Sequence, residues 1–119
     1  LDIGANVGTT SVDPAIKSNC KVICIEASKF HISLLSDNLY TNNIYSLIFH
    51  CAVTSPEKCR INKELKLFIS PGNTGASSLF ASWNTSQVDS IVERVPTSTI
   101  DGCLSFSKEN IDLIGLAKN

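Results

Sequence analysis

Two acidic residues and two glycines near the start of the chain have the types and spacing of a nucleotide-cofactor site. Asp2 ends a short apolar stretch, and Gly4 and Gly8 frame the turn that follows. Glycine has no Cβ, so the backbone of such a turn can approach a ligand closely. Glu26 follows at nearly the offset of about 20 residues at which an acid meets ribose hydroxyls in adenine-cofactor sites. Because one carboxylate can accept hydrogen bonds from both hydroxyls, the pattern predicts a pocket for a nucleoside-type ligand.

The glycine spacing separates two classes of ligand. A dinucleotide fingerprint reads G-x-G-x-x-G, and Asn6 stands where its middle glycine would be. A carboxylate at Asp2 would repel a pyrophosphate, whereas it would attract the ammonium and sulfonium groups of S-adenosylmethionine. The residues therefore favour S-adenosylmethionine as cofactor. A nicotinamide-dependent oxidoreductase is the weaker alternative.

The end of the third predicted strand completes the candidate pocket. Small residues there, Cys51 and Ala52, suit the flat slot of an adenine ring, and Ala27 follows Glu26. The candidate cofactor-binding residues are thus Asp2, Gly4, Asn6, Gly8, Glu26, Ala27, Cys51 and Ala52.

Each of these residues also has a simpler structural interpretation. Gly4 and Gly8 could serve a tight strand–helix turn, Glu26 could be a solvated strand end, and Asp2 could cap the following helix. His31 and His50 lack a partnering motif, and both are interpreted as structural. No residue can be assigned as a catalytic base, and no metal site is predicted.

The elements that would position these residues alternate between strand and helix. A β-branched run over residues 21–25 predicts a buried strand ending at Glu26. A helix is predicted over residues 29–40, with Ser28 as its cap and an apolar face of Phe30, Leu34, Leu35 and Leu39. Residues 46–53 predict a third strand. This βαβ rhythm implies an α/β fold with a mostly parallel sheet.

The first helix and the second half of the chain are less regular. Pro14 would break a helix interior, so the helix is predicted to start late, with Asp13 as N-cap. Residues 57–95 predict a strand–loop–strand insert, with strands over 65–70 and 87–95 around a loop at 71–78. A short helix interrupted by Gly102 is expected over 98–106, and a fourth core strand over 111–117.

Composition restricts the classes of partner. The chain has 119 residues, enough for one domain, and a net charge of −1, which gives no electrostatic footprint for nucleic acid or anionic membrane. No apolar run reaches the length of about 20 residues that a membrane span needs. The cysteines are odd in number and lack C-x-x-C spacing, so neither a disulfide framework nor a zinc site is predicted. A cytoplasmic, reducing location is expected. The cysteines are Cys20, Cys24, Cys51, Cys59 and Cys103.

Taken together, these motifs resemble the FkbM-type methyltransferases. The opening loop of residues 1–8 and the Ile25-Glu26-Ala27 strand end carry the resemblance first, although many methyltransferases share that loop. A glycine–serine loop followed by a Thr-Ile-Asp element is more specific to this family. The resemblance continues through residues 34–35, 38–39, 42–43, 52–53, 73–79, 99–101 and 111–114.

The resemblance implies a Rossmann-like class I methyltransferase fold, S-adenosylmethionine as cofactor, and methyl transfer to oxygen on a sugar or small metabolite. It places Asp2, Gly4, Asn6 and Gly8 along the methionine part of the cofactor and Glu26 on the ribose.

The resemblance fails at the end of the chain. The family continues its fourth strand as Lys-Ile-Asp-Val-Glu-Gly, and here Ala117 and Asn119 replace the two acids. We therefore expect a partial domain, incomplete at both ends, that binds cofactor without turnover. A catalytically inactive methyltransferase-like module is the alternative.

Overall fold

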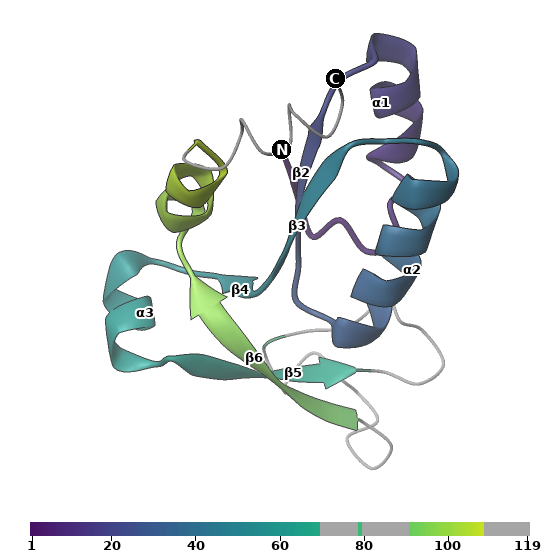
Figure 1. Ribbon diagram of the computed structural model, residues 1–119. Helices are drawn as coiled ribbons and strands as arrows, with labels where there is room; N and C mark the ends of the chain where they lie inside the picture. The colour runs from purple at the N-terminus through teal and green to yellow at the C-terminus, as the bar shows by residue number, and fades with distance from the viewer. Residues whose placement is uncertain (70–78, 80–90, 109–119) are drawn as a thin grey trace.

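A three-stranded parallel sheet forms the centre of the computed structural model, which describes residues 1–69, 79 and 91–108 (Figure 1). Its strands β1 (Asp2–Ile3), β2 (Val22–Glu26) and β3 (Ser46–His50) lie in the order β1-β2-β3. Asp2 is in register with Cys24, and Glu26 with His50. The predicted α/β class with a mostly parallel sheet is thus confirmed at this level.

Helices cover both faces of this sheet because side chains of β2 alternate between them. Val22 and Cys24 pack in one apolar cluster with Leu35 and Leu39, on the side of α1 (Val12–Ser18) and α2 (Lys29–Thr41). Ile25 packs in another cluster with Cys103, from the helical residues 100–108. Figure 1 shows these helices on opposite sides of the sheet.

The buried stripe of α2 differs from the predicted one. Leu35 and Leu39 are buried as expected, but Phe30 is 61% and Leu34 40% exposed. His31 takes the third buried place. Residues four apart share a helix face, so His31 lies in line with Leu35 and Leu39, while Phe30 and Leu34 form the neighbouring stripe.

Helix α1 begins at Val12, two residues earlier than a start at Pro14 would give. Its N-cap is Ser11, so the prediction of Asp13 as N-cap was wrong. Pro14 still fits, because the first N–H groups of a helix have no intrahelical acceptor to lose. The helix is short, with seven residues, and Asn19 ends it in a left-handed conformation.

A second sheet contains β4 (Ala52–Val53), β5 (Glu64–Ile69) and β6 (Ile91–Ser98), in the order β4-β6-β5. Strand β5 pairs antiparallel to β6, which bears out the two predicted strands, and β4 runs parallel to β6. The single strand predicted over residues 46–53 was wrong. The segment divides at Cys51, whose N–H donates to the Glu26 carbonyl. Before Cys51 it pairs with β2, and after Cys51 it pairs with β6.

Two helical segments also depart from prediction. A helix, α3 (Pro56–Ile61), stands at the start of the predicted strand–loop–strand insert, and the hydroxyl of its cap residue Ser55 accepts from the Lys58 N–H. Residues 100–108 are helical through Gly102 without interruption. The predicted loop at 71–78 and the predicted strand at 111–117 lie outside the described residues.

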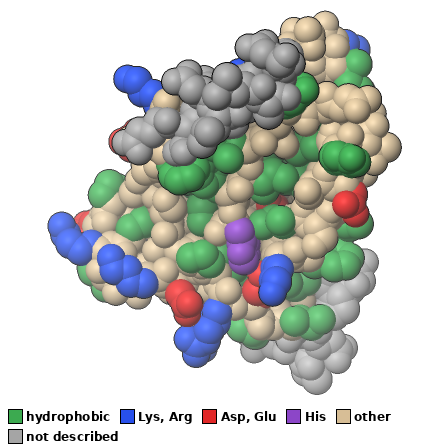
Figure 2. All heavy atoms as spheres, in the orientation of Figure 1, with side chains coloured by type: hydrophobic (Ala, Val, Ile, Leu, Met, Phe, Trp, Pro, Cys, Tyr) green, Lys and Arg blue, Asp and Glu red, His purple; other side chains and the backbone are tan. Residues whose placement is uncertain are grey.

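Figure 2 shows apolar side chains around the middle of one face of the molecule, together with a histidine that has charged side chains beside it, and further charged side chains toward the edges. Phe49 of β3 and Phe106 meet edge to face, with ring centroids 5.6 Å apart. No helix within the described ranges is long and apolar enough to cross a membrane.

Candidate cofactor site

A cavity of about 320 Å³ opens at the carboxyl ends of β1 and β2. This is where open parallel sheets bind ligands, and the volume lies at the lower end of the range of small-molecule sites. Both sheets contribute to its wall, through Ile3 and Ile25 of the first sheet and Val53 and Leu67 of the second. Six predicted site residues also line it, namely Gly4, Asn6, Glu26, Ala27, Cys51 and Ala52.

The loop after β1 takes left-handed backbone angles at three positions. Gly4 has φ 75°, Asn6 φ 53° and Gly8 φ 95°. Asparagine tolerates this region better than most residues, so Asn6 supplies the backbone geometry that a middle glycine would supply. The sequence-based distinction from a dinucleotide loop therefore depends on the side chains of Asn6 and Asp2 and not on backbone freedom.

Gly4 and Gly8 have different neighbours. A Cβ on Gly4 would meet no described atom within 4 Å, and Gly4 lines the cavity. A Cβ on Gly8 would lie 3.1 Å from Leu35 Cδ1 and 3.4 Å from Val12 Cγ2. Gly4 thus leaves space beside the cavity, whereas Gly8, outside its described lining, allows the loop to pack on α1 and α2.

Glu26 connects the glycine loop to the start of α2. Its Oε2 accepts from the Asn6 N–H at 2.7 Å, and its Oε1 accepts from the Ser28 N–H at 2.8 Å. The residue is only 7% exposed, so its interpretation as a solvated strand end was wrong. A carboxylate has about four acceptor positions, and two backbone donors leave capacity for a ligand.

Asp2 lies away from the described lining of the cavity. Its Oδ2 accepts from the Thr10 hydroxyl at 2.7 Å and from the hydroxyl of Ser11, the N-cap of α1. Asp2 thus contacts hydroxyls at the start of α1, whereas the N-cap position belongs to Ser11, so the simpler interpretation of Asp2 as the helix cap was wrong. The structure does not bring Asp2 to the cavity with Gly4 and Glu26.

A distant carboxylate completes the N-terminus of α2. The Lys29 N–H donates to Glu93 Oε1 of β6 at 2.8 Å, and within the described part of the chain the Ser28 hydroxyl makes no cap bond. His50 Nε2 lies 3.3 Å from the same Glu93 oxygen and 3.0 Å from the Ala27 carbonyl oxygen. Sequence reasoning missed Glu93, because no local pattern connects residues 64 positions apart.

His31 also belongs to the cavity wall, where sequence reasoning gave it a purely structural place. It is 3% exposed, and its Nδ1 lies 3.6 Å from Glu26 Oε1. Its Nε2 is buried and has no hydrogen-bond partner among the described residues.

Burial holds the thiols of Cys51, which lines the cavity, and of Cys24, which lies outside its described lining, in the protonated form. Burial, together with Cys103 whose Sγ lies 3.9 Å away, raises the pKa of Cys51 from 9.0 to about 12. Burial also raises the pKa of Cys24. The native state therefore holds the Cys51 proton more tightly than the unfolded chain does. The resulting stabilisation is complete below pH 9 and is lost as the pH rises toward 12.

These surroundings predict an ordered reactivity of the cysteines. At pH 8, iodoacetamide is expected to alkylate exposed Cys20 first, whereas Cys24, Cys51 and Cys103 react only after unfolding, because the thiolate is the nucleophile. Peptide mass spectrometry with and without denaturant measures this order. Alkylation of Cys51 as fast as Cys20 in the native protein would contradict the buried placement.

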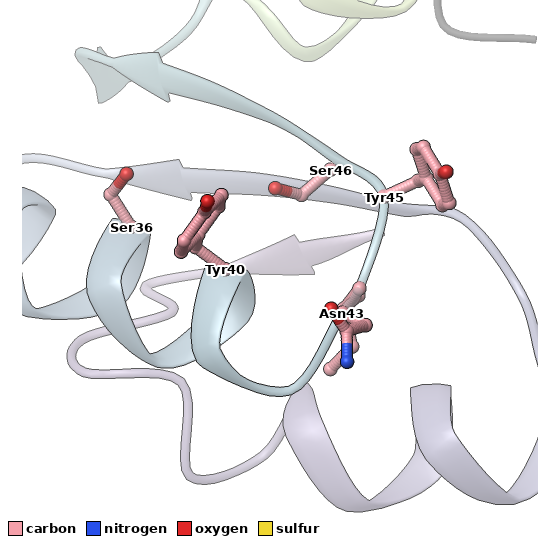
Figure 3. Close-up of a pocket in the computed structure, with 6 residues that line it drawn as sticks. Ser36, Tyr40, Asn43, Tyr45 and Ser46 are labelled. Atoms are coloured by element: carbon pink, nitrogen blue, oxygen red, sulfur yellow. The ribbon is translucent and has the colours of Figure 1, made fainter. Parts of the chain in front are cut away.

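A second hollow, of about 380 Å³, lies between the end of α2 and the start of β3. Figure 3 shows its labelled residues around the turn that joins these elements, with Tyr45 directed away from the others. This hollow contains none of the predicted site residues and lies at the amino end of β3, away from the carboxyl ends. Its lining comprises Ser36, Tyr40, Asn43, Ile44, Tyr45 and Ser46.

Comparison with known proteins gives no match: no family model, no curated sequence and no solved structure is significantly similar to this chain. Chemical inference about the cavity therefore depends on its own residues. Within the described residues, no group of three or more His, Cys, Asp or Glu side chains could hold a metal ion.

Proposed function

We propose that the chain is the cofactor-binding part of an S-adenosylmethionine-dependent methyltransferase. The observation that carries this proposal is Glu26, a buried carboxylate at the carboxyl end of β2 that borders a cavity and is fixed to the glycine loop through Asn6. The fold proposed for the intact domain is the Rossmann-like class I methyltransferase fold, which the small parallel sheet is compatible with.

The lining residues fit an adenosine moiety. Glu26 has acceptor capacity for ribose hydroxyls, and the open side of Gly4 lets a ligand approach the backbone. Small side chains at Ala27, Cys51 and Ala52 leave room for a flat ring. Asp2 is not part of this arrangement, because its carboxylate accepts hydrogen bonds from the hydroxyls of Thr10 and Ser11 at the start of α1. The ammonium contact that the sequence suggested for Asp2 is therefore not part of the proposal.

The bound cofactor would supply an electrophilic methyl group on a sulfonium centre. The residues of this chain would contribute binding and orientation, which convert a bimolecular displacement into an effectively unimolecular one. Glu26 would fix the ribose, and the glycine loop would position the adjoining part of the cofactor. The proposed acceptor is a hydroxyl of a sugar or small metabolite in the intact protein.

Calorimetry tests the proposal directly. S-adenosylhomocysteine is expected to bind the purified chain with one-to-one stoichiometry, and NADH is expected not to bind. Binding of NADH alone would favour a dinucleotide-dependent oxidoreductase. If neither ligand binds, the proposal is contradicted, and an inactive module that binds no cofactor remains as the alternative.

Gly4→Ala separates ligand access from folding. Its methyl group would enter open space beside the cavity, so S-adenosylhomocysteine affinity is expected to fall about tenfold, which is about 1.4 kcal/mol. The free energy of unfolding should fall by about 1 kcal/mol, because alanine disfavours a positive φ. Calorimetry and urea denaturation measure the two effects.

Asn19→Ala is the matched control for Gly4→Ala. It places alanine at φ 48° at the end of α1, away from the cavity, and is expected to change stability without changing affinity. Equal losses of affinity in both variants would show that Gly4 has no specific relation to the ligand.

A further inference from the structure

The ring of His31 has one nitrogen whose hydrogen-bonding capacity is unused. Buried polar groups in proteins are almost always hydrogen-bonded, and leaving one unpaired costs free energy. His31 Nε2 is such an exception among the described residues, on a side chain that is 3% exposed. The same side chain lines the cavity that Glu26 borders, so a ligand there could supply the missing partner.

The packing position of His31 does not itself require an imidazole. It shares the buried stripe of α2 with Leu35 and Leu39, where an aliphatic side chain would remove the unpaired nitrogen at no hydrogen-bonding cost. Ser28 Oγ is the other buried atom without a partner in the described part of the chain, but Ser28 is not among the residues around the cavity. Of these two unpaired atoms, His31 Nε2 is therefore the one that belongs to a residue lining the cavity.

The neighbouring carboxylate determines what His31 can offer. Glu26 Oε1 lies 3.6 Å from Nδ1, and a negative oxygen there favours the tautomer with its proton on Nδ1. Nε2 then carries a lone pair and acts as an acceptor. Glu26 and His31 thus present acceptors from the end of β2 and the first turn of α2 to one cavity.

We infer that His31 Nε2 is a ligand-binding acceptor that, with Glu26, selects a ligand carrying two neighbouring hydroxyl donors, such as the ribose diol of an adenosine cofactor. This inference rests on the proposed function and goes beyond it by naming a specificity-determining residue. A site that hydrogen-bonds a hydroxyl rejects the analogue lacking it, because its buried acceptor is then left unpaired.

The experiment combines a protein change with a ligand change. Calorimetry would measure S-adenosylhomocysteine and its 2′-deoxy and 3′-deoxy forms against the wild type, His31→Leu and His31→Gln. For one of the deoxy forms, the ratio of parent to deoxy affinity is expected to be about tenfold larger in the wild type than in His31→Leu. The reason is that the leucine variant has already lost the hydrogen bond that the deoxy ligand removes. His31→Gln, whose amide oxygen can accept, should restore part of the preference.

The outcomes separate this inference from the proposal it rests on. If the wild type does not bind S-adenosylhomocysteine, both fail. If the wild type binds it and the deoxy preferences of His31→Leu equal those of wild type, His31 is only a packing residue and the inference alone is overturned.

A measurement on the wild type does not depend on either variant folding. In ¹⁵N NMR of the imidazole, Nδ1 is expected to be protonated, and the Nε2 resonance should shift toward that of a hydrogen-bonded acceptor when S-adenosylhomocysteine is added. An Nε2 that is already protonated in the ligand-free protein, or that is unaffected by bound ligand, would overturn the inference.

Discussion

Glu26→Gln is expected to abolish measurable binding of S-adenosylhomocysteine and to lower the free energy of unfolding by about 2 kcal/mol. The carboxylate accepts from two backbone donors, the N–H groups of Asn6 and Ser28. A glutamine side chain has one acceptor oxygen, so its amide N–H₂ would face one of these donors. The glycine loop or the start of α2 would then lose its contact, and the ribose would lose its charged acceptor.

Calorimetry and urea denaturation of the same preparation measure the two losses. The matched control is Glu64→Gln, because Glu64 is exposed and pairs only with exposed Arg94 in the described structure, at 3.8 Å. Exposed pairs contribute little to stability, so the control should bind and unfold like the wild type. Unchanged affinity in Glu26→Gln would show that Glu26 holds the loop without contacting ligand.

The second large effect is expected at Leu35, at the contact between α2 and the glycine loop. Leu35→Ala should lower the free energy of unfolding by about 3 kcal/mol, because the side chain is fully buried and its removal leaves a cavity. Leu34→Ala, one residue away but 40% exposed, is the matched control and should cost clearly less. Equal losses of stability in the two variants would contradict the assignment of Leu35, and not Leu34, to the buried stripe of α2.

Gly8 and Leu35 are expected to be energetically coupled. Gly8→Ala alone places a methyl group 3.1 Å from Leu35 Cδ1, at a φ of 95° that alanine disfavours. In the double variant the shortened residue 35 relieves this contact, so the combined loss should be smaller than the sum of the single losses. Denaturant titration of the four proteins gives the coupling, and strict additivity would contradict the contact.

The sequence predicted best those features that depend on short-range patterns. The β-branched run at residues 21–25 predicted β2 (Val22–Glu26), and the helix predicted over residues 29–40 matches α2 (Lys29–Thr41) to within one residue. The position of Glu26 at the end of β2 put it beside Gly4 because the carboxyl ends of parallel strands share an edge.

Features that depend on distant residues were not predictable. Nothing local indicates that Glu93 approaches the α2 N-terminus, or that the chain leaves the first sheet at Cys51. The place of Asp2 depends on its hydrogen bonds with the hydroxyls of Thr10 and Ser11, which no sequence pattern had singled out. His31 was passed over because its partner, Glu26, is contributed by a different element.

The passage of the chain between its two sheets at Cys51 has a mechanical consequence. Ile3 and Gly4 border the cavity from the first sheet, while Ala52 and Leu67 border it from the second. A molecule that fills the cavity would contact both sheets at once and link them. A bound ligand would therefore resist rotation of one sheet relative to the other. The rigidity of the two-sheet arrangement would then depend on the ligand as well as on the protein.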